Sequence, residues 1–336
     1  MRVAWYETQG PARDVLKVGI MADPTPGPGE LRIRVAASGI NPGDIKKRQD
    51  AFGYGMPYPR VIPHSDGAGV VDLVGNGVPT DWVGRRVWCY GAQSYRAFGT
   101  AAEYVVLPVG QVVTLPEDVS FAQGACLGIP AITAHRCVHV AGSVAGRTVL
   151  VQGGAGAVGV CAVQLARRAG ALVIATVRSS PDEAVALEAG ADHVLRPGAD
   201  FIDRVRALAP EGVHHIVEVA FAANIATDLE LLAVRGSVAT YATDDGDPAI
   251  PFWPLLFKNI RVDFLGCDDF TAADKAEAAR AVNEALAAGW VGMPIAARFS
   301  LEEIATAHEA VEASRQRGRV VVMFLSANSL DCDGAR

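Results

Sequence analysis

Hydrophobic and polar positions alternate with a period of two along the first third of the chain. The runs LRIRVAASGI (31–40), AGVVDLVG (68–75) and AEYVVLP (102–108) follow this pattern, and segments rich in glycine and proline separate them. Alternation of this kind, bounded by turn residues, is typical of β-strands with one buried face. Residues 1–121 therefore predict a β-rich, barrel-like domain.

From about Phe121 the pattern changes, and apolar runs alternate with segments of helical periodicity. The predicted order is a helix over 121–140, a strand over 148–152, a helix after it, a strand over 172–176, a helix over 181–188, a strand over 192–195, a helix over 201–209, a strand over 214–220, an amphipathic segment near 225–232, and strands over 236–242 and 259–266. Such alternation predicts a parallel sheet covered by helices on both faces.

The last part of the chain predicts two more helices and a strand. One helix covers 272–288, and a second covers 301–317 and starts with Ser300 and Glu303 in a capping-box arrangement. The apolar strand 318–325 has no partner in a completed doubly wound sheet, so we expect it to return to the β-rich domain. The predicted fold is α/β, with a doubly wound Rossmann cofactor domain over 122–267 and a β-rich domain formed by 1–121 and 268–336.

Composition narrows the class of protein. With 336 residues, half of them hydrophobic, the chain is long enough for two domains with their own cores. A formal net charge of −7 disfavours nucleic-acid and membrane partners. No apolar run approaches the length of about 18 residues that a membrane span needs. The start, MRVAWYETQG, resembles no signal peptide, and the six cysteines lack C-x-x-C spacing, so we expect a cytoplasmic protein with reduced thiols.

The most informative segment follows the strand 148–152. It is a glycine-rich turn that leads into a helix, and it consists of Gly154, Ala155, Gly156, Ala157, Val158 and Gly159. Residues without a β-carbon allow the backbone to turn sharply and to approach a pyrophosphate closely, while free N–H groups at the helix start face the phosphates. The strand before and the helix after this turn predict a dinucleotide site.

The end of the strand 172–176 indicates which dinucleotide binds. An NAD site usually places a carboxylate there to accept from the ribose 2′-hydroxyl. This chain instead has Thr176, Arg178 and Ser179, which suit a 2′-phosphate. We therefore expect NADP(H), although Asp182 and Glu183 follow closely and remain alternative ribose acceptors.

Several motifs in a fixed order carry a family resemblance. They are GINPGD (39–44), IPHSDGAGVVDLVGNGV (62–78), AEYVVLP, VLVQGGAGAVGVCAVQLARRAGA (149–171) and GRVVVMF (318–324). Over nearly the whole chain this order resembles the medium-chain dehydrogenase/reductase superfamily, and within it the zinc-independent quinone oxidoreductase and ζ-crystallin branch. The resemblance implies a GroES-like β-rich domain beside the Rossmann domain, and NADPH as the cofactor.

The zinc ligands of the superfamily's metal-dependent members have no counterpart in this sequence. Asn41, Ser65 and about Ile129 stand at the three ligand positions that the resemblance implies. Catalytic zinc needs three protein ligands and an open position, so no metal site is expected. His64 and Asp66 offer two candidate ligands on one extended segment, which are too few.

Without a Lewis acid, the substrate must be easy to reduce. A quinone or an α,β-unsaturated carbonyl spreads the added charge over a conjugated system, so hydrogen-bond donors suffice. The expected activity is therefore hydride transfer from NADPH to such an acceptor. Two alternatives stay open: an enoyl-thioester or biosynthetic-intermediate reductase of the same superfamily, and a non-catalytic NADPH-binding protein like a crystallin.

The resemblance also implies roles for single residues. Asn41 matches a contact to the substrate oxygen, or else is a turn residue before Pro42. Thr133 matches a position beside the nicotinamide ring, or else bonds its own helix backbone. Tyr54, in a glycine-rich loop, is a candidate to stack on a flat acceptor or to donate a proton, although simple packing is the alternative.

Further cofactor contacts are expected at strand ends and from a late arginine. Tyr241 and Gly266 end predicted strands at the carboxyl edge, where doubly wound sheets bind ligands. Arg315 is implied for the 2′-phosphate by family position alone, and Arg196 is a weaker candidate. The apolar strand 260–265 should form an edge of the cofactor sheet, which predicts a homodimer that covers its free hydrogen-bonding groups.

Overall fold

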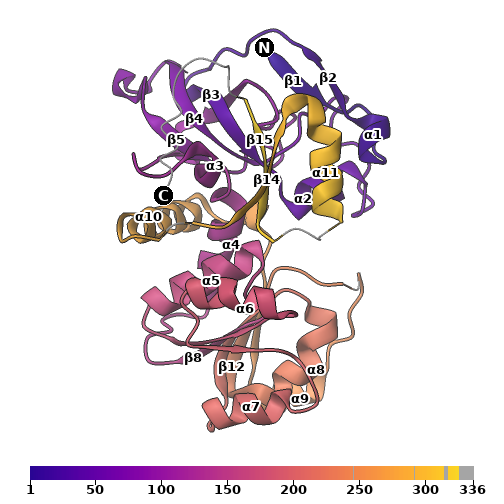
Figure 1. Ribbon diagram of the computed structural model, residues 1–336, viewed down its shortest axis with the longest axis vertical. Coiled ribbons are helices and arrows are strands. Elements are labelled where there is room, and N and C mark those ends of the chain that lie inside the picture. The colour runs from indigo at the N-terminus through magenta and orange to yellow at the C-terminus, as the bar shows by residue number, and fades with distance from the viewer. Residues whose placement is uncertain (245, 291, 314–316, 325–336) are drawn as a thin grey trace. The chain divides into compact units, whose positions relative to one another are not determined.

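The computed structural model describes residues 1–244, 246–290, 292–313 and 317–324 (Figure 1). They form two compact units. The N-terminal unit contains Met1–Ile129 and the described residues from Val282 onward, and the central unit contains Pro130–Ala281. The divisions lie inside the helices α4 (Gly128–His139) and α10 (Ala272–Ala287), whereas the division expected from the sequence followed residues 121 and 267.

The N-terminal unit is built on a mixed sheet in the order β14-β15-β3-β4-β5-β7, with β6 also paired to β3. Its strands are β3 (Glu30–Gly39), β4 (Asp66–Val74), β5 (Arg86–Cys89), β6 (Tyr104–Pro108), β7 (Val112–Thr114), β14 (Ile295–Ser300) and β15 (Arg319–Met323), beside the hairpin of β1 (Arg2–Trp5) and β2 (Lys17–Ile20). Its helices include α1 (Ala12–Val15), α2 (Pro42–Arg48), α3 (Phe121–Gly124) and α11 (Ile304–Glu312). Val322 of β15 pairs antiparallel with Ser38 of β3, which confirms that the late strand returns to this unit.

The central unit is a parallel sheet in the order β10-β9-β8-β11-β12-β13. Its elements are β8 (Thr148–Val151), α5 (Ala157–Arg168), β9 (Leu172–Thr176), α6 (Ser180–Glu188), β10 (His193–Leu195), α7 (Phe201–Leu208), β11 (Val213–Glu218), α8 (Phe221–Leu231), β12 (Leu232–Thr240), α9 (Phe252–Lys258) and β13 (Arg261–Phe264). This order confirms the predicted doubly wound fold, and the strand order reverses between β8 and β11, where such sheets bind ligands.

Helices lie against the central sheet (Figure 1). Helix α5 contacts β8, β9 and α6, while α8 contacts β11, β12 and α7. Leu150, Ile174 and Ile216 of the sheet form one core cluster with Phe201 and Phe221 of the helices. Burying each such side chain contributes about 1.5–3 kcal/mol. Among the described residues, no helix combines the length and apolarity that crossing a bilayer would require.

The single helix predicted over 121–140 was wrong, because the structure divides it into α3 and α4. A β-carbon at Gly128 would lie 2.1 Å from Asp66 Oδ1, and the Ile129 N–H donates to both Asp66 carboxylate oxygens at 2.9 and 3.0 Å. Because the helix restarts at Gly128, the Ile129 N–H lies in its first turn and bonds outside the helix, to Asp66. Apolar periodicity carries no information about such a distant acceptor.

A chain of buried polar side chains supports Asp66 from the other side. Arg48 Nε donates to His308 Nδ1 (3.3 Å), the two Nε2 atoms of His308 and His64 lie 2.9 Å apart, and His64 Nδ1 lies 2.8 Å from Ser38 Oγ. Ser38 Oγ is 2.7 Å from Thr100 Oγ1, which donates to the Asp66 carbonyl at 2.6 Å. The chain therefore joins α2, α11, β3 and β4.

The hydrogen-bond partners at the two ends of this series of side chains determine which atom carries each proton. Because the Thr100 hydroxyl donates to a carbonyl, Ser38 must donate to Thr100 and accept from His64 Nδ1–H. His64 Nε2 then accepts from His308 Nε2–H, and His308 Nδ1 accepts from Arg48. Both imidazoles are neutral in this arrangement. Burial favours the same state, since it lowers the pKa of His64 to about 3 and that of His308 well below its ordinary value.

Neutral buried imidazoles predict that acid destabilises the protein. An unfolded histidine takes up a proton near pH 6.5, whereas the folded pKa of His64 is about 3, so stability is present above about pH 6.5 and is lost as the pH falls toward 3. Between pH 7 and pH 5 His64 alone should remove about 2 kcal/mol from the free energy of unfolding.

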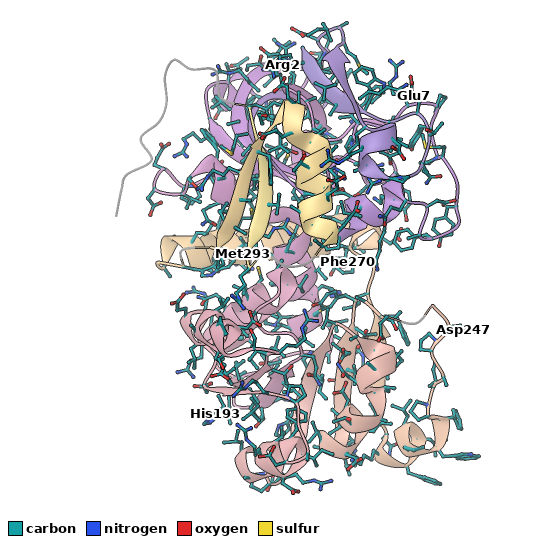
Figure 2. All side chains as sticks on the ribbon, turned by 45° about the vertical axis from the view of Figure 1, so that its right-hand side comes forward. Arg2, Glu7, His193, Asp247, Phe270 and Met293 are labelled. Carbon is teal, nitrogen blue, oxygen red and sulfur yellow. The ribbon has the colours of Figure 1, made fainter. Side chains whose placement is uncertain are left out.

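We expect His64→Asn to reduce this loss, because asparagine does not titrate and tolerates the left-handed φ of +77° at this position. Urea denaturation at pH 7 and at pH 5 measures the difference. His193→Asn, in β10 (Figure 2), is the control and should lose as much stability as the unaltered protein. Equal losses in all three proteins would contradict the titration of His64.

Candidate functional site

In the turn between β8 and α5, backbone segments approach so closely that there is no room for a side chain at several positions. Gly153 has φ +71°, and Gly156, the N-cap of α5, donates to the Gly153 carbonyl at 2.9 Å. A β-carbon at Gly159 would lie 2.1 Å from the same carbonyl, and one at Gly154 would lie 2.7 Å from the β-carbon of Ala175. Sequence reasoning placed Gly154, Gly156 and Gly159 in this turn but missed Gly153, whose conformation favours glycine most strongly.

This turn leaves backbone donors at the start of α5. Val160 is the first residue whose N–H bonds within the helix, to the Gly156 carbonyl at 2.8 Å, so the first-turn N–H groups of Ala157, Val158 and Gly159 have no acceptor in the helix. Ala155 precedes them in the turn. The Gly154 N–H donates to the Thr176 carbonyl at 2.8 Å and so anchors the turn on β9. Together with the helix dipole, these amides favour the binding of an anion.

Polar side chains below the turn hold it in place. Thr176 Oγ1 accepts from the Gly153 N–H at 3.0 Å and donates to Gln152 Oε1 at 2.7 Å. Gln152 Nε2 in turn donates to Asp228 Oδ1 at 2.9 Å. Thr176, expected from the sequence as a cofactor contact, is buried and positions the loop. Gln152 was missed, since a single glutamine at a strand end carries no signal in the sequence.

The start of α6 gathers cationic and hydroxyl groups. Arg178 and Ser180 are exposed, and Ser179 is the N-cap of the helix. The Ser179 hydroxyl donates to Asp182, while Arg196 pairs with Glu183 at 3.0 Å and donates to Ser180 Oγ at 3.2 Å. The carboxylates that were alternative ribose acceptors thus have partners within this cluster. Arg315 lies outside the described residues.

A cavity of about 420 Å³ opens at the carboxyl ends of β12 and β13. It is lined by Phe221, Thr240, Tyr241, Ala242, Thr243, Gly246, Pro248, Phe264, Leu265 and Gly266. Tyr241 and Gly266, expected from the sequence as cofactor contacts, both belong to this wall. Burial raises the pKa of Tyr241 well above its ordinary value, so its phenol stays protonated.

Asn41 lies in a buried network of the N-terminal unit. It is the N-cap of α2, and its backbone N–H donates to Asp44 Oδ2 at 2.7 Å. Its side-chain Nδ2 donates to Asp66 Oδ2 at 2.7 Å, and its Oδ1 accepts from Arg319 Nη2 at 2.7 Å. The primary amide keeps a second N–H that these contacts do not use. The structure places Asn41 at the start of α2 rather than in an isolated turn before Pro42, and its polar contact to a substrate oxygen stays a prediction.

The carboxyl group of Asp66 has opposing influences on its protonation. Burial raises the pKa of Asp66 to about 7. The hydrogen bond from Asn41, the charge of Arg319 and the Ile129 amide act in the opposite direction and lower it. Asp66 therefore titrates near neutral pH while it fixes the orientation of the Asn41 amide.

The other two candidate catalytic residues differ in exposure. Thr133 is buried on α4, in the central unit. Tyr54 is 88% exposed in the N-terminal unit, and its ring stacks on Phe52 with centroids 6.0 Å apart. Tyr54 therefore packs little against its own unit, and its role stays a prediction.

The described residues contain no cluster of three or more His, Cys, Asp and Glu arranged to hold a metal ion. At the three positions that correspond to zinc ligands, Asn41 and Ser65 are buried and Ile129 uses its backbone N–H toward Asp66. The guanidinium of Arg319 already supplies a cation beside Asn41.

Comparisons with known proteins identify two family models on the chain. Residues 157–284 match "Zinc-binding dehydrogenase", and residues 27–117 match "Alcohol dehydrogenase GroES-like domain". Among curated proteins, the quinone oxidoreductase of Rattus norvegicus is 32% identical over 328 residues, which cover 95% of this chain and 96% of that protein. The human quinone oxidoreductase is 30% identical and covers the same shares.

Solved structures with a similar fold include a quinone oxidoreductase as well. A mycobacterial quinone oxidoreductase matches with a TM-score of 0.84 and 28% identity, over 96% of this chain and all of that one. A mycobacterial protein complexed with NADPH matches with a TM-score of 0.83 and 27% identity over the same shares.

Proposed function

Because the chain belongs to the quinone oxidoreductase branch of the medium-chain dehydrogenase/reductase superfamily, we propose that it is an NADPH-dependent reductase of quinones or α,β-unsaturated carbonyls that works without zinc. The observation that carries this proposal is the glycine turn of the central unit, where Gly153 and Gly159 hold the first amides of α5 free for a pyrophosphate. The NADPH complex of a structural relative supports the choice of cofactor.

The residues of the central unit fit NADPH. The amides of Ala157, Val158 and Gly159 would bind the pyrophosphate, and Arg178, Ser180 and Arg196 would bind the 2′-phosphate. Tyr241 and Gly266 would line the cavity at the nicotinamide end. When bound, NADPH supplies the hydride, and the protein orients it and excludes water.

The donor set of the N-terminal unit does not fit zinc. Both polar atoms of the Asn41 side chain are engaged, by Asp66 and by the Arg319 cation. A divalent ion at Asn41 would repel that guanidinium and would find an uncharged amide and hydroxyl where thiolate and imidazole ligands are needed. Stabilisation of charge in the acceptor therefore falls to hydrogen-bond donors.

We assign the donor role to the second N–H of Asn41, which Asp66 and Arg319 orient. Tyr54 would stack on a flat acceptor, and Thr133 would contact the nicotinamide ring. A conjugated acceptor suits this set, because it spreads the developing charge and needs no Lewis acid.

Turnover with quinones tests the proposal directly. We expect loss of NADPH absorbance with 1,4-benzoquinone or 9,10-phenanthrenequinone, or with simple enones, and a fall in kcat of about tenfold to a hundredfold for Asn41→Ala, as one transition-state hydrogen bond is lost. Turnover confined to enoyl thioesters would identify the alternative substrate class. Tight NADPH binding without turnover on any acceptor would favour a non-catalytic role and contradict the proposal.

Arg178→Ala tests the choice of NADPH over NADH. Removing a charge-assisted contact to the 2′-phosphate should raise the Kd for NADPH by about tenfold to a hundredfold. The Kd for NADH should not change, because NADH lacks that phosphate. Calorimetric titration measures both, with the exposed Arg204→Ala on α7 as control. Equal weakening of both nucleotides would contradict the assignment.

We also propose a homodimer through the cofactor sheet. β13 is the outermost strand beside β12, and Phe264 at its end is exposed, as are Phe252, Trp253 and Phe257 of α9, which contacts β12. A second copy would pair with the free edge of β13 and cover these aromatic side chains.

Light scattering should therefore return twice the mass of the chain. Phe257→Glu places a charge on this surface and should shift the protein toward monomer. Val83→Glu, at an exposed apolar position of the N-terminal unit, is the matched control and should stay dimeric. A monomeric unaltered protein would contradict the pairing of edges.

A further inference from the structure

Two carboxyl groups lie buried together under the phosphate turn of the central unit. Glu218 ends β11 and Asp228 lies on α8, and both side chains are inaccessible to solvent. Asp228 and Glu218 lie close enough for a hydrogen bond to form between them once one of the two carries a proton. Two negative charges buried beside each other repel strongly, which favours a single proton between them.

The hydrogen-bond donors around the pair indicate where this proton resides. Glu218 accepts from the Ala220 N–H and, at 3.1 and 3.2 Å, from Asn224 Nδ2, so both of its carboxyl oxygens have a donor. Asp228 Oδ1 accepts from Gln152, but Oδ2 is buried and no described residue donates to it. A proton on Oδ2 turns that atom into the missing donor toward Glu218. Burial and the Glu218 charge raise the pKa of Asp228 accordingly.

The pair is connected to the phosphate turn by a short series of hydrogen bonds. Asp228 holds the Gln152 amide, Gln152 holds the Thr176 hydroxyl, and Thr176 accepts from the Gly153 N–H. Gln152 and Asn224, which bond the two carboxyl groups, also line a cavity of about 170 Å³. The pair therefore sits directly behind the ligand edge of the sheet.

The other charged groups near the pair form their contacts with different residues. On α8 itself, Glu230 pairs with Arg206 of α7 at 3.6 Å. From α9, Lys258 donates to the carbonyls of Leu229 and Leu232. After β12, the phenol of Tyr241 interacts with Glu218 but carries no charge. Within the described part of the chain, the negative charge of the second carboxyl group is therefore neutralised by the proton.

We propose that Glu218 and Asp228 share one proton and act as positioning residues that hold the phosphate turn, through Gln152 and Thr176, in the conformation that binds NADPH. Loss of the proton leaves two repelling carboxylates, which disturbs the contact from Asp228 to Gln152. It also adds a negative charge behind a site for an anionic cofactor. Affinity for NADPH therefore falls as the pair ionises. This inference rests on the proposed binding of NADPH.

Titration of NADPH from about pH 7 upward, over the range in which the protein stays folded, tests the inference. In this range the 2′-phosphate, with a pKa of about 6, is already ionised. The Kd of the unaltered protein should rise by about tenfold, the order of effect expected from one added buried charge. Asp228→Asn keeps the contacts to Gln152 and Glu218 with a permanently neutral group, so its Kd should stay nearly constant.

Two further variants make the result specific. Glu218→Gln donates to Asp228 Oδ2 in place of the proton and should flatten the pH profile in the same way, so it serves if Asp228→Asn fails to fold. Glu230→Gln, two residues from Asp228 on the same helix but exposed, should follow the unaltered protein. A purely structural role would lower thermal stability in the variants without altering the pH slope of Kd.

An infrared measurement on the protein without nucleotide separates this inference from the proposed function. A neutral carboxylic-acid band should be present in the unaltered protein and reduced in Asp228→Asn. If no NADPH binds at any pH, the proposed function fails, while this band still reports on the shared proton. If Asp228→Asn and Glu218→Gln keep the pH slope of the unaltered protein, or if the band does not change, the inference is overturned.

Discussion

The contact between the Gly153 carbonyl and Gly159 is the constraint on which the central unit depends. Only hydrogen atoms fit between these two backbone segments, since a β-carbon would come within 2.1 Å of the carbonyl oxygen. This closeness allows α5 to start directly above β8 and to present its first amides at the switch point of the sheet. The anion site is therefore a consequence of backbone packing, and side chains such as Thr176 and Gln152 secure it from below.

In the N-terminal unit, the polar groups around Asn41 include the positive charge of Arg319. Arg319, from the late strand β15, reaches Asn41 on α2, and Asn41 reaches Asp66 on β4. Three segments far apart in the sequence thus meet at one amide. The return of β15 therefore matters for this network, because the strand delivers the guanidinium that holds Asn41.

In both units, buried polar side chains find their hydrogen-bond partners in one another. In the N-terminal unit, a chain from Arg48 through two neutral histidines to Thr100 satisfies each donor and acceptor in turn. In the central unit, the proton that we propose between Glu218 and Asp228 would do the same beside the contact from Gln152. Both networks fix backbone segments next to functional residues, since an unpaired polar group at such positions would be costly.

The sequence by itself determined the order of strands and helices, the glycine turn and the arginine at the end of β9, because hydrophobic periodicity and glycine spacing are local properties. It did not reveal the break between α3 and α4, the role of Gln152, or the cluster of Arg196 with Ser180. Nor could it show that Asn41 lies between Asp66 and Arg319. These features were decided only in the tertiary structure, because each depends on a partner that the chain brings from a distant segment and that no local pattern encodes.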